Sequence, residues 1–151
     1  MDLKTDFVRN QENAQDDLNE NFLEISQSAS TVTLSHSGTD WIDSSVRNNF
    51  DLANYFFMRF GKLVYFNCRI NNKAAQTSLA DIVTGDKIPA GFTPSMQNDT
   101  WSGALSVTQQ NSSTATMKAS VAPDRIKFFS QGTGNHYVSG TWCTDDPMPE
   151  N

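Results

Sequence analysis

The hydrophobic period of this sequence changes near residue 30, and this change predicts a chain built of two unlike parts. Before that point, apolar residues recur at the spacing of one helix face, and neither Pro nor Gly occurs before Gly38. After it, apolar and polar residues alternate along several short segments, as in strands with one buried face. We therefore expect a helical arm with its linker over residues 1–30 and a β-sandwich head domain over residues 31–151.

The predicted helix of the arm covers residues 6–27, with Thr5 as its N-cap. Its narrow apolar stripe can be buried in two ways: against the chain's own head, or against copies of the same helix in a short coiled coil. In the second case the polar Asn21 would occupy a core position and fix the register of the helices. The residues expected to form this self-association or docking surface are Phe7, Ala14, Leu18, Asn21, Phe22 and Ile25.

Acidic residues are concentrated in the arm. Residues 6–27 carry six acidic residues and one basic residue, whereas the head is nearly neutral, and the chain has a net charge of −6. This balance argues against nucleic-acid binding, and no apolar run is long enough to insert into a membrane. The first residues lack the basic and apolar regions of a signal peptide, so we expect synthesis in a cytoplasm.

Turn residues divide the head into short strands. Gly61 separates two long alternating segments and Pro123 separates two shorter ones, so each pair is predicted to form an antiparallel hairpin. The expected strands include residues 54–60, 62–70, 101–107, 116–121, 125–129 and 136–144. Both faces of the second strand are partly apolar, which predicts that a second sheet or a neighbouring subunit covers them. Together with the regular turns, this pattern predicts a mainly β fold, an antiparallel sandwich or jelly roll. The acidic tail after Thr144 is expected to be frayed.

Cys68 and Cys143 are the only cysteines of the chain. Neither has a second cysteine at the spacing of a metal motif. In a chain made in a cytoplasm we expect two buried thiols rather than a disulfide. No metal and no cofactor is predicted.

The sequence contains none of the common catalytic or nucleotide-binding motifs. Its paired carboxylates, at residues 16–17 and 145–146, are adjacent in sequence and do not resemble a glycosidase pair that faces a substrate from two sides. His36 and His136 stand among small polar residues, as surface histidines do. We therefore expect a protein that is not an enzyme.

Aromatic residues in polar surroundings are the best candidates for ligand contact. Trp41, Trp101 and Trp142 are each flanked by polar residues. An exposed indole can stack on the apolar face of a sugar while its neighbours bind the hydroxyl groups. His136 and Tyr137 end a glycine-rich loop, which is a second candidate. The alternatives are that each Trp lies in the core or at a subunit interface, and that the loop is a plain turn.

Three segments resemble elements of phage tail, baseplate and tail-fibre proteins from phages of Gram-positive hosts. Residues 16–25 (DDLNENFLEI) resemble the D-x-L-N-x-N-F-x-E-[IL] element near the N-terminus of these proteins. Residues 88–94 (IPAGFTP) are similar to their I/L-P-x-G-F-x-P segment, which follows a Phe/Tyr-rich strand pair like residues 55–70. Residues 140–145 (GTWCTD) are similar to their closing G-x-W-x-T-x-D-like strand.

The resemblance implies a homotrimer in the virion, with an N-terminal helix bundled with its copies or attached to other tail, baseplate or capsid proteins. It also implies a distal β-sandwich that binds host cell-wall polysaccharide or teichoic acid. No binding residue is carried over, because receptor loops diverge. The linker over residues 26–30 is shorter than the shaft of many receptor-binding relatives. The alternative is therefore a structural connector or decoration protein that binds only other virion proteins. A third hypothesis, a depolymerase that cleaves wall polymers, is the least favoured, since no catalytic site is recognised.

Overall fold

The computed structural model describes residues 14–84, 88–95, 103–111, 114–123 and 125–149. Helix α1 spans Ala14–Ala29, and strand β1 follows after a single residue, Ser30. The helix predicted over residues 6–27 is thus confirmed from Ala14 onwards, while the preceding residues lie outside the described part of the chain. Asp16 and Asp17 occupy the first turn, where the helix dipole favours negative charge.

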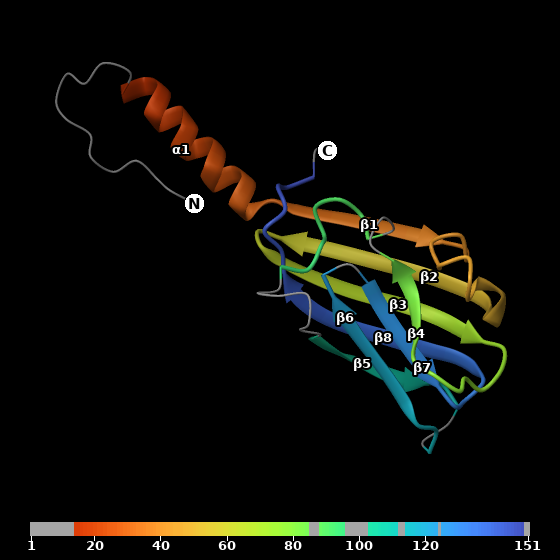
Figure 1. Cartoon of the computed structure of the whole chain (residues 1–151). Helices are drawn as coiled ribbons and strands as arrows, with labels where there is room; N and C mark the ends of the chain where they lie inside the picture. Colours follow the sequence, from red (N-terminus) through yellow and green to blue (C-terminus); the bar gives the residue numbers. More distant parts are fainter. Residues whose placement is uncertain (1–13, 85–87, 96–102, 112–113, 124, 150–151) are drawn as a thin grey trace.

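The head is one antiparallel sheet of eight strands (Figure 1). A short 3-10 helix, η1, precedes β2 at Arg47–Asn49. Along the sheet the strands follow the order β1-β2-β3-β8-β5-β6-β7-β4. Their bounds are β1 Thr31–Ser37, β2 Phe50–Phe60, β3 Leu63–Asn72, β4 Ala80–Thr84, β5 Gly103–Gln109, β6 Met117–Ala122, β7 Arg125–Ser130 and β8 Gly134–Cys143.

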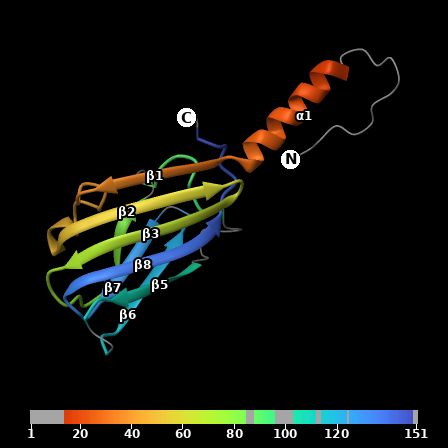
Figure 2. The same cartoon turned by 180° about the vertical axis from the view of Figure 1, so that it is seen from behind.

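Strand β5 lets this sheet curl into two layers. Its first half, Gly103–Leu105, pairs with β6, and its second half, Ser106–Gln109, pairs with β8. The strands β4, β6 and β7 therefore fold back over the inner face of β2, β3 and β8, as the two views in Figures 1 and 2 show. The mainly β, antiparallel expectation is confirmed, but the layers belong to one curled sheet rather than to two separate sheets.

Both predicted hairpins are present. β2 and β3 turn at Gly61, whose φ of 55° suits a residue without a side chain. β6 and β7 pair around Pro123. In β3 the residues Val64, Phe66, Cys68 and Ile70 face inward and are buried, because side chains alternate along a strand and the second layer covers this face.

The segment 88–94 and the end of β8 meet at a buried arginine. The Arg59 side chain is 4% exposed, and its guanidinium donates hydrogen bonds to the backbone carbonyls of Gly61, Gly91, Asp146 and Pro147. The carboxylate of Asp146 in turn accepts hydrogen bonds from the amides of Gly91 and Thr93, at 3.2 and 3.0 Å. The tail expected to be frayed is therefore held against the head as far as residue 149.

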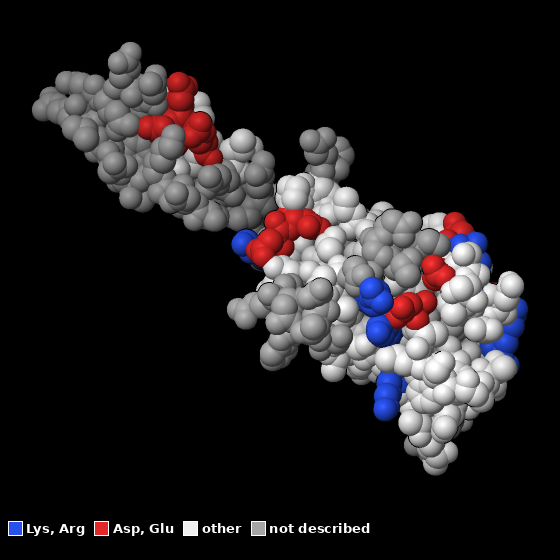
Figure 3. Space-filling model, in the orientation of Figure 1, with Lys and Arg blue, Asp and Glu red and all other residues white. Residues whose placement is uncertain are grey.

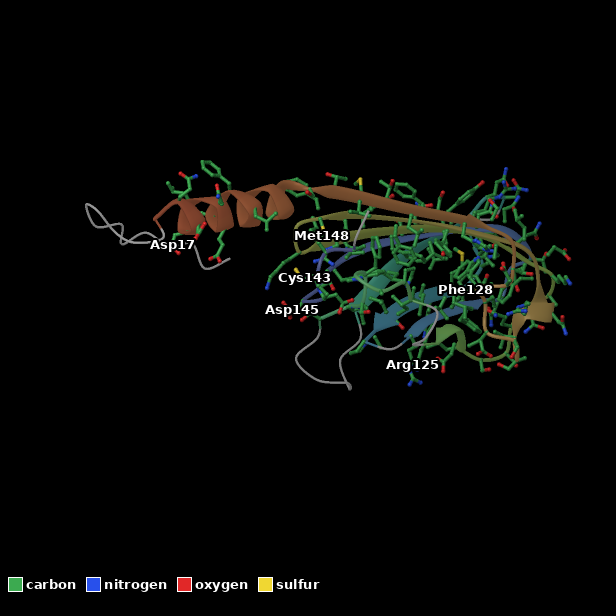
Figure 4. All side chains as sticks on the ribbon, turned by 90° about the horizontal axis from the view of Figure 1, so that it is seen from above. Asp17, Arg125, Phe128, Cys143, Asp145 and Met148 are labelled. Carbon is green, nitrogen blue, oxygen red and sulfur yellow. The ribbon has the colours of Figure 1, made fainter. Side chains whose placement is uncertain are left out.

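The arm and the tail lie at the same end of the sheet. Helix α1 runs away from the head and continues the line of β1 (Figures 1 and 4). Cys143, Asp145 and Met148 lie near this junction in Figure 4. The opposite end, which we call the distal end, holds the end of β1, the start of β2, the end of β3 and the start of β8.

Candidate functional site

A shallow depression of about 210 Å³ lies toward the distal end, between β1, β2 and the segment that joins them. It is lined by His36, Asp40, Trp41 and Tyr55. His36 and Tyr55 are cross-strand partners on β1 and β2, so their side chains lie on the same face of the sheet. The register of the hairpin therefore brings together residues that are far apart in sequence.

Trp41 fixes the segment that connects β1 and β2 to the backbone of β2. The indole is 7% exposed, and its Nε1 donates a hydrogen bond to the carbonyl of Ala53 at 3.0 Å. The amide of Gly38 donates to the same carbonyl, also at 3.0 Å. Gly38 has a φ of 126°, which residues with side chains rarely adopt, so the glycine allows the turn that leads from β1 to Asp40.

Arg47 holds the other side of the same segment. Its guanidinium donates to the carbonyl of Asp40 at 2.8 Å and to the carbonyl of Ile42 at 2.9 and 3.1 Å. These bonds leave the carboxylate of Asp40 at the rim of the depression. The rim is therefore positioned by the backbone contacts of a buried Trp and a half-buried Arg.

His36 and Asp40 form a hydrogen-bonded pair at the rim of the depression. The Nε2 of His36 lies 2.7 Å from Oδ1 of Asp40. This hydrogen bond lowers the pKa of the Asp40 carboxyl below its ordinary value. Burial raises the pKa of the Tyr55 hydroxyl, and the charge of Asp40 adds to the effect. At neutral pH the depression thus offers an ionised carboxylate beside a neutral phenol.

Aromatic rings form the walls. The rings of Tyr55 and His36 stack with centroids 5.5 Å apart. The rings of Trp41 and Tyr55 form a T-shaped pair with centroids 5.2 Å apart. A carboxylate accepts hydrogen bonds from hydroxyl groups, and an aromatic ring contacts the C–H face of a sugar. The arrangement can bind a small hydroxylated ligand; the described residues contain no cluster of three metal-ligating side chains.

Trp41 and Trp142 do not present exposed indoles. Each is 7% exposed. Trp142 packs on Phe57 and Phe66, and its Nε1 donates to the carbonyl of Phe92 at 2.9 Å, at the end of the sheet near the arm. Both rings serve the core, which was the alternative, because each indole N–H finds a backbone acceptor inside the fold. Trp101 lies outside the described residues.

His136 and Tyr137 are neighbours on β8 that point to opposite faces. His136 is fully buried, and its Nε2 lies 2.7 Å from Oγ of Ser130, while its Nδ1 lies 2.9 Å from the carbonyl of Gly134. Burial lowers the pKa of this imidazole. The expectation of an exposed His136 is therefore wrong, and the Ser–His pair has no surface at which a substrate could reach it. Tyr137 is 38% exposed on the outer face of the sheet.

The predicted surface of the arm is described in part. Leu18 is 40% and Phe22 67% exposed, and Asn21 is half-buried. The described part of the apolar stripe of α1 is therefore not buried against the head. Phe7 lies outside the described residues; Ala14 and Ile25 belong to α1, but their side chains are not described. Figure 3 shows acidic side chains on the arm and mixed charges over the head.

One of the two cysteines, Cys143, differs from its expected state. Both are free thiols, as expected, and Cys68 is buried, which raises the pKa of its thiol. Cys143 is exposed, because it points to the outer face of β8. No helix among the described residues is long and apolar enough to cross a membrane.

Sequence reasoning missed His36, Asp40 and Tyr55 as parts of one site. Asp40 belongs to the polar flank of Trp41, and Tyr55 belongs to the predicted strand over residues 54–60. The available signal was the spacing of His36 and Asp40 around Gly38; the place of Tyr55 depends on the strand register. Comparison with models of known protein families gives no match, and no curated protein sequence matches the chain.

Proposed function

We propose that this chain is a phage virion protein that attaches to the host cell surface, a tail-fibre or baseplate receptor-binding protein. In this proposal three copies associate through α1, which also docks on other tail or baseplate proteins. The head then binds cell-wall polysaccharide or teichoic acid of a Gram-positive host. The segments over residues 16–25, 88–94 and 140–145 support this class by their resemblance to such proteins.

The observation that carries the proposal is the polarity of the molecule. An arm with exposed apolar side chains leaves one end of the sheet, and the depression of His36, Asp40, Trp41 and Tyr55 lies toward the other. An attachment protein needs such a division, because one end must be held by the particle while the other meets the host. Weak binding of a sugar at each depression becomes useful when copies are repeated on one particle.

Retention on purified Gram-positive cell walls tests the proposal. We expect Asp40→Asn to lower retention of the full-length protein at least about tenfold, because the carboxylate accepts hydrogen bonds from hydroxyl groups and bonds to charged groups are the stronger ones. Asp51→Asn is the matched control, since Asp51 lies on the same half of β2 and pairs with Lys73 at 3.2 Å, outside the depression.

Walls extracted with acid to remove teichoic acid separate the two classes of receptor. Loss of retention after extraction identifies teichoic acid, and unchanged retention identifies wall polysaccharide. Equal retention of Asp40→Asn and the native chain would remove the depression from the proposal. Failure of the native chain to bind any wall would contradict attachment.

A structural connector that binds only virion proteins is the second candidate. The observation in its favour is the acidic character of α1, which has acidic residues in its first turn and no basic residue in its last. Such a helix suits a basic socket on another protein. This candidate predicts incorporation into particles that depends on residues 1–30 and no retention on walls.

A further inference from the structure

The outer face of β2 and β3 carries exposed apolar side chains near the arm. Cross-strand partners point to the same face, and the register pairs Phe60 with Leu63 and Met58 with Tyr65. Phe60 is 55% and Leu63 50% exposed. Phe56 follows on the same face of β2, one step further from the arm. We call the five residues Phe56, Met58, Phe60, Leu63 and Tyr65 the apolar patch.

The strands beside the apolar patch present uncharged side chains to it. On β1 the outward side chains opposite it are Thr31, Thr33 and Ser35, and on β8 they are Ser139, Thr141 and Cys143. Charged groups border it at two places: the exposed pair of Lys62 and Asp145, 2.9 Å apart, follows at the β2–β3 turn, and Arg69 lies in the next row toward the distal end. The outer face therefore changes from apolar near the arm to polar near the distal end.

The apolar patch lies at the end of the head from which the arm leaves. Thr31, the first residue of β1, pairs with Phe60, and only Ser30 separates Thr31 from α1. Further along the arm Leu23 is 59% exposed, and Phe22 and Leu18 are also exposed. The chain thus exposes apolar side chains both on the arm and at the arm end of the head, and exposed patches of this kind mark contact sites.

We propose that the apolar patch is a contact between copies of this chain, packed parallel with their arms together. A parallel copy that covers the stripe of α1 brings its own head to the same height, so one partner covers both surfaces. Each copy has a net charge of −6, so two copies repel one another, and contact through apolar side chains keeps acidic groups out of the interface itself. The proposal rests on the self-association in the proposed function, but not on the saccharide.

Neither surface is large enough to act alone. A short helix is marginally stable by itself, and a flat patch of a few side chains is smaller than a stable interface needs. Removing the apolar patch from the full-length chain should therefore convert assemblies to monomers at micromolar concentration. The variant is Phe60→Thr with Leu63→Thr, because threonine suits a strand and makes the face polar. Leu79→Thr, at an exposed leucine elsewhere on the head, is the control.

Light scattering gives the mass of each form, and thiol labelling shows which face is covered. Cys143 lies beside Leu63 on the outer face, whereas Cys68 is buried in the core. We expect slow labelling of both thiols in the native assembly. In the double variant one thiol, Cys143, should react rapidly while Cys68 stays protected, which also shows that the variant is folded.

The possible outcomes separate this proposal from the proposed function. An assembly of unchanged mass in the folded double variant would overturn the role of the apolar patch and leave assembly through α1 intact. A native chain that is monomeric at all concentrations would overturn both self-association and this contact. Retention on cell walls is measured separately, so its failure leaves the contact between copies standing.

Discussion

Arg59 is a charged side chain in a place that its residue type rarely occupies. Its four hydrogen bonds all go to backbone carbonyls of three segments: the β2–β3 turn, the segment around Gly91 and the tail. Gly91 has a φ of 87°, and a Cβ there would overlap the side chain of Pro149. A planar group with several donors is suited to joining carbonyls that no strand pairing satisfies.

Replacing Arg59 by Met should lower the free energy of unfolding by at least about 3 kcal/mol, because buried carbonyls lose their donors. Arg59→Lys should lose less, since it keeps the charge and some of the hydrogen bonds. Urea unfolding at one fixed protein concentration measures the difference. A loss below about 1 kcal/mol in the Met variant would show that water replaces the guanidinium without cost.

His136 makes stability depend on pH. Its pKa is lowered by burial, so the folded chain keeps the imidazole neutral at a pH where the unfolded chain, with an ordinary value of 6.5, binds a proton. This contribution to stability is complete above pH 6.5 and is lost as the pH falls toward the lowered pKa of the folded state. We expect the melting temperature of the native chain to fall between pH 7 and pH 5 more steeply than that of His136→Gln. Parallel curves would contradict this role.

At the scale of elements, α1 and the strands differ in how their apolar residues are covered. The stripe of α1 leaves Leu18 and Phe22 exposed, and its acidic residues are not balanced by basic ones in its last turn. The strands bury their inward side chains in a shared core, although β2 and β3 also carry the apolar patch on their outer face. The head therefore has a core of its own, and α1 is the element for which the proposed function supplies a partner.

Removal of the arm tests this difference. A version that starts at Thr31 should keep the β-type circular dichroism spectrum and a cooperative melt, since the core lies within the head. Its mass should be that of a monomer, whereas the full-length chain should be a trimer. Trimers in both forms would place the contacts in the head alone, and monomers in both would contradict self-association and favour α1 as a docking segment for another virion protein.

At the scale of the whole molecule, the curled sheet separates two ends with different chemistry. The end near the arm combines α1, the apolar patch and the Arg59 cluster, and the other combines the depression with polar loops. The separation follows from topology: β1 leads from the arm toward the distal end, and β2 returns. His36 on β1 and Phe60 on β2 belong to the same strand pair but therefore lie at different ends.

Local sequence patterns predicted the elements well. The alternation of β3, the turn at Gly61 and the helical spacing from Ala14 to Ile25 all depend on near neighbours, and each was found. The strand β4 was missed, because its five residues carry little alternation of their own.

The candidate site could not be predicted in the same way. Polar neighbours of Trp41, Trp142 and His136 suggested exposed side chains, but all three are buried. A flanking Asp or Thr shows only that its own side chain points to solvent. In a strand such as β8 the side chain beside it, here His136 or Trp142, points to the opposite face. Sequence by itself therefore determined the arm, the hairpins and the mainly β class. The tertiary structure alone decided which aromatic rings are covered, because the register and the curl of the sheet set the partners of each face.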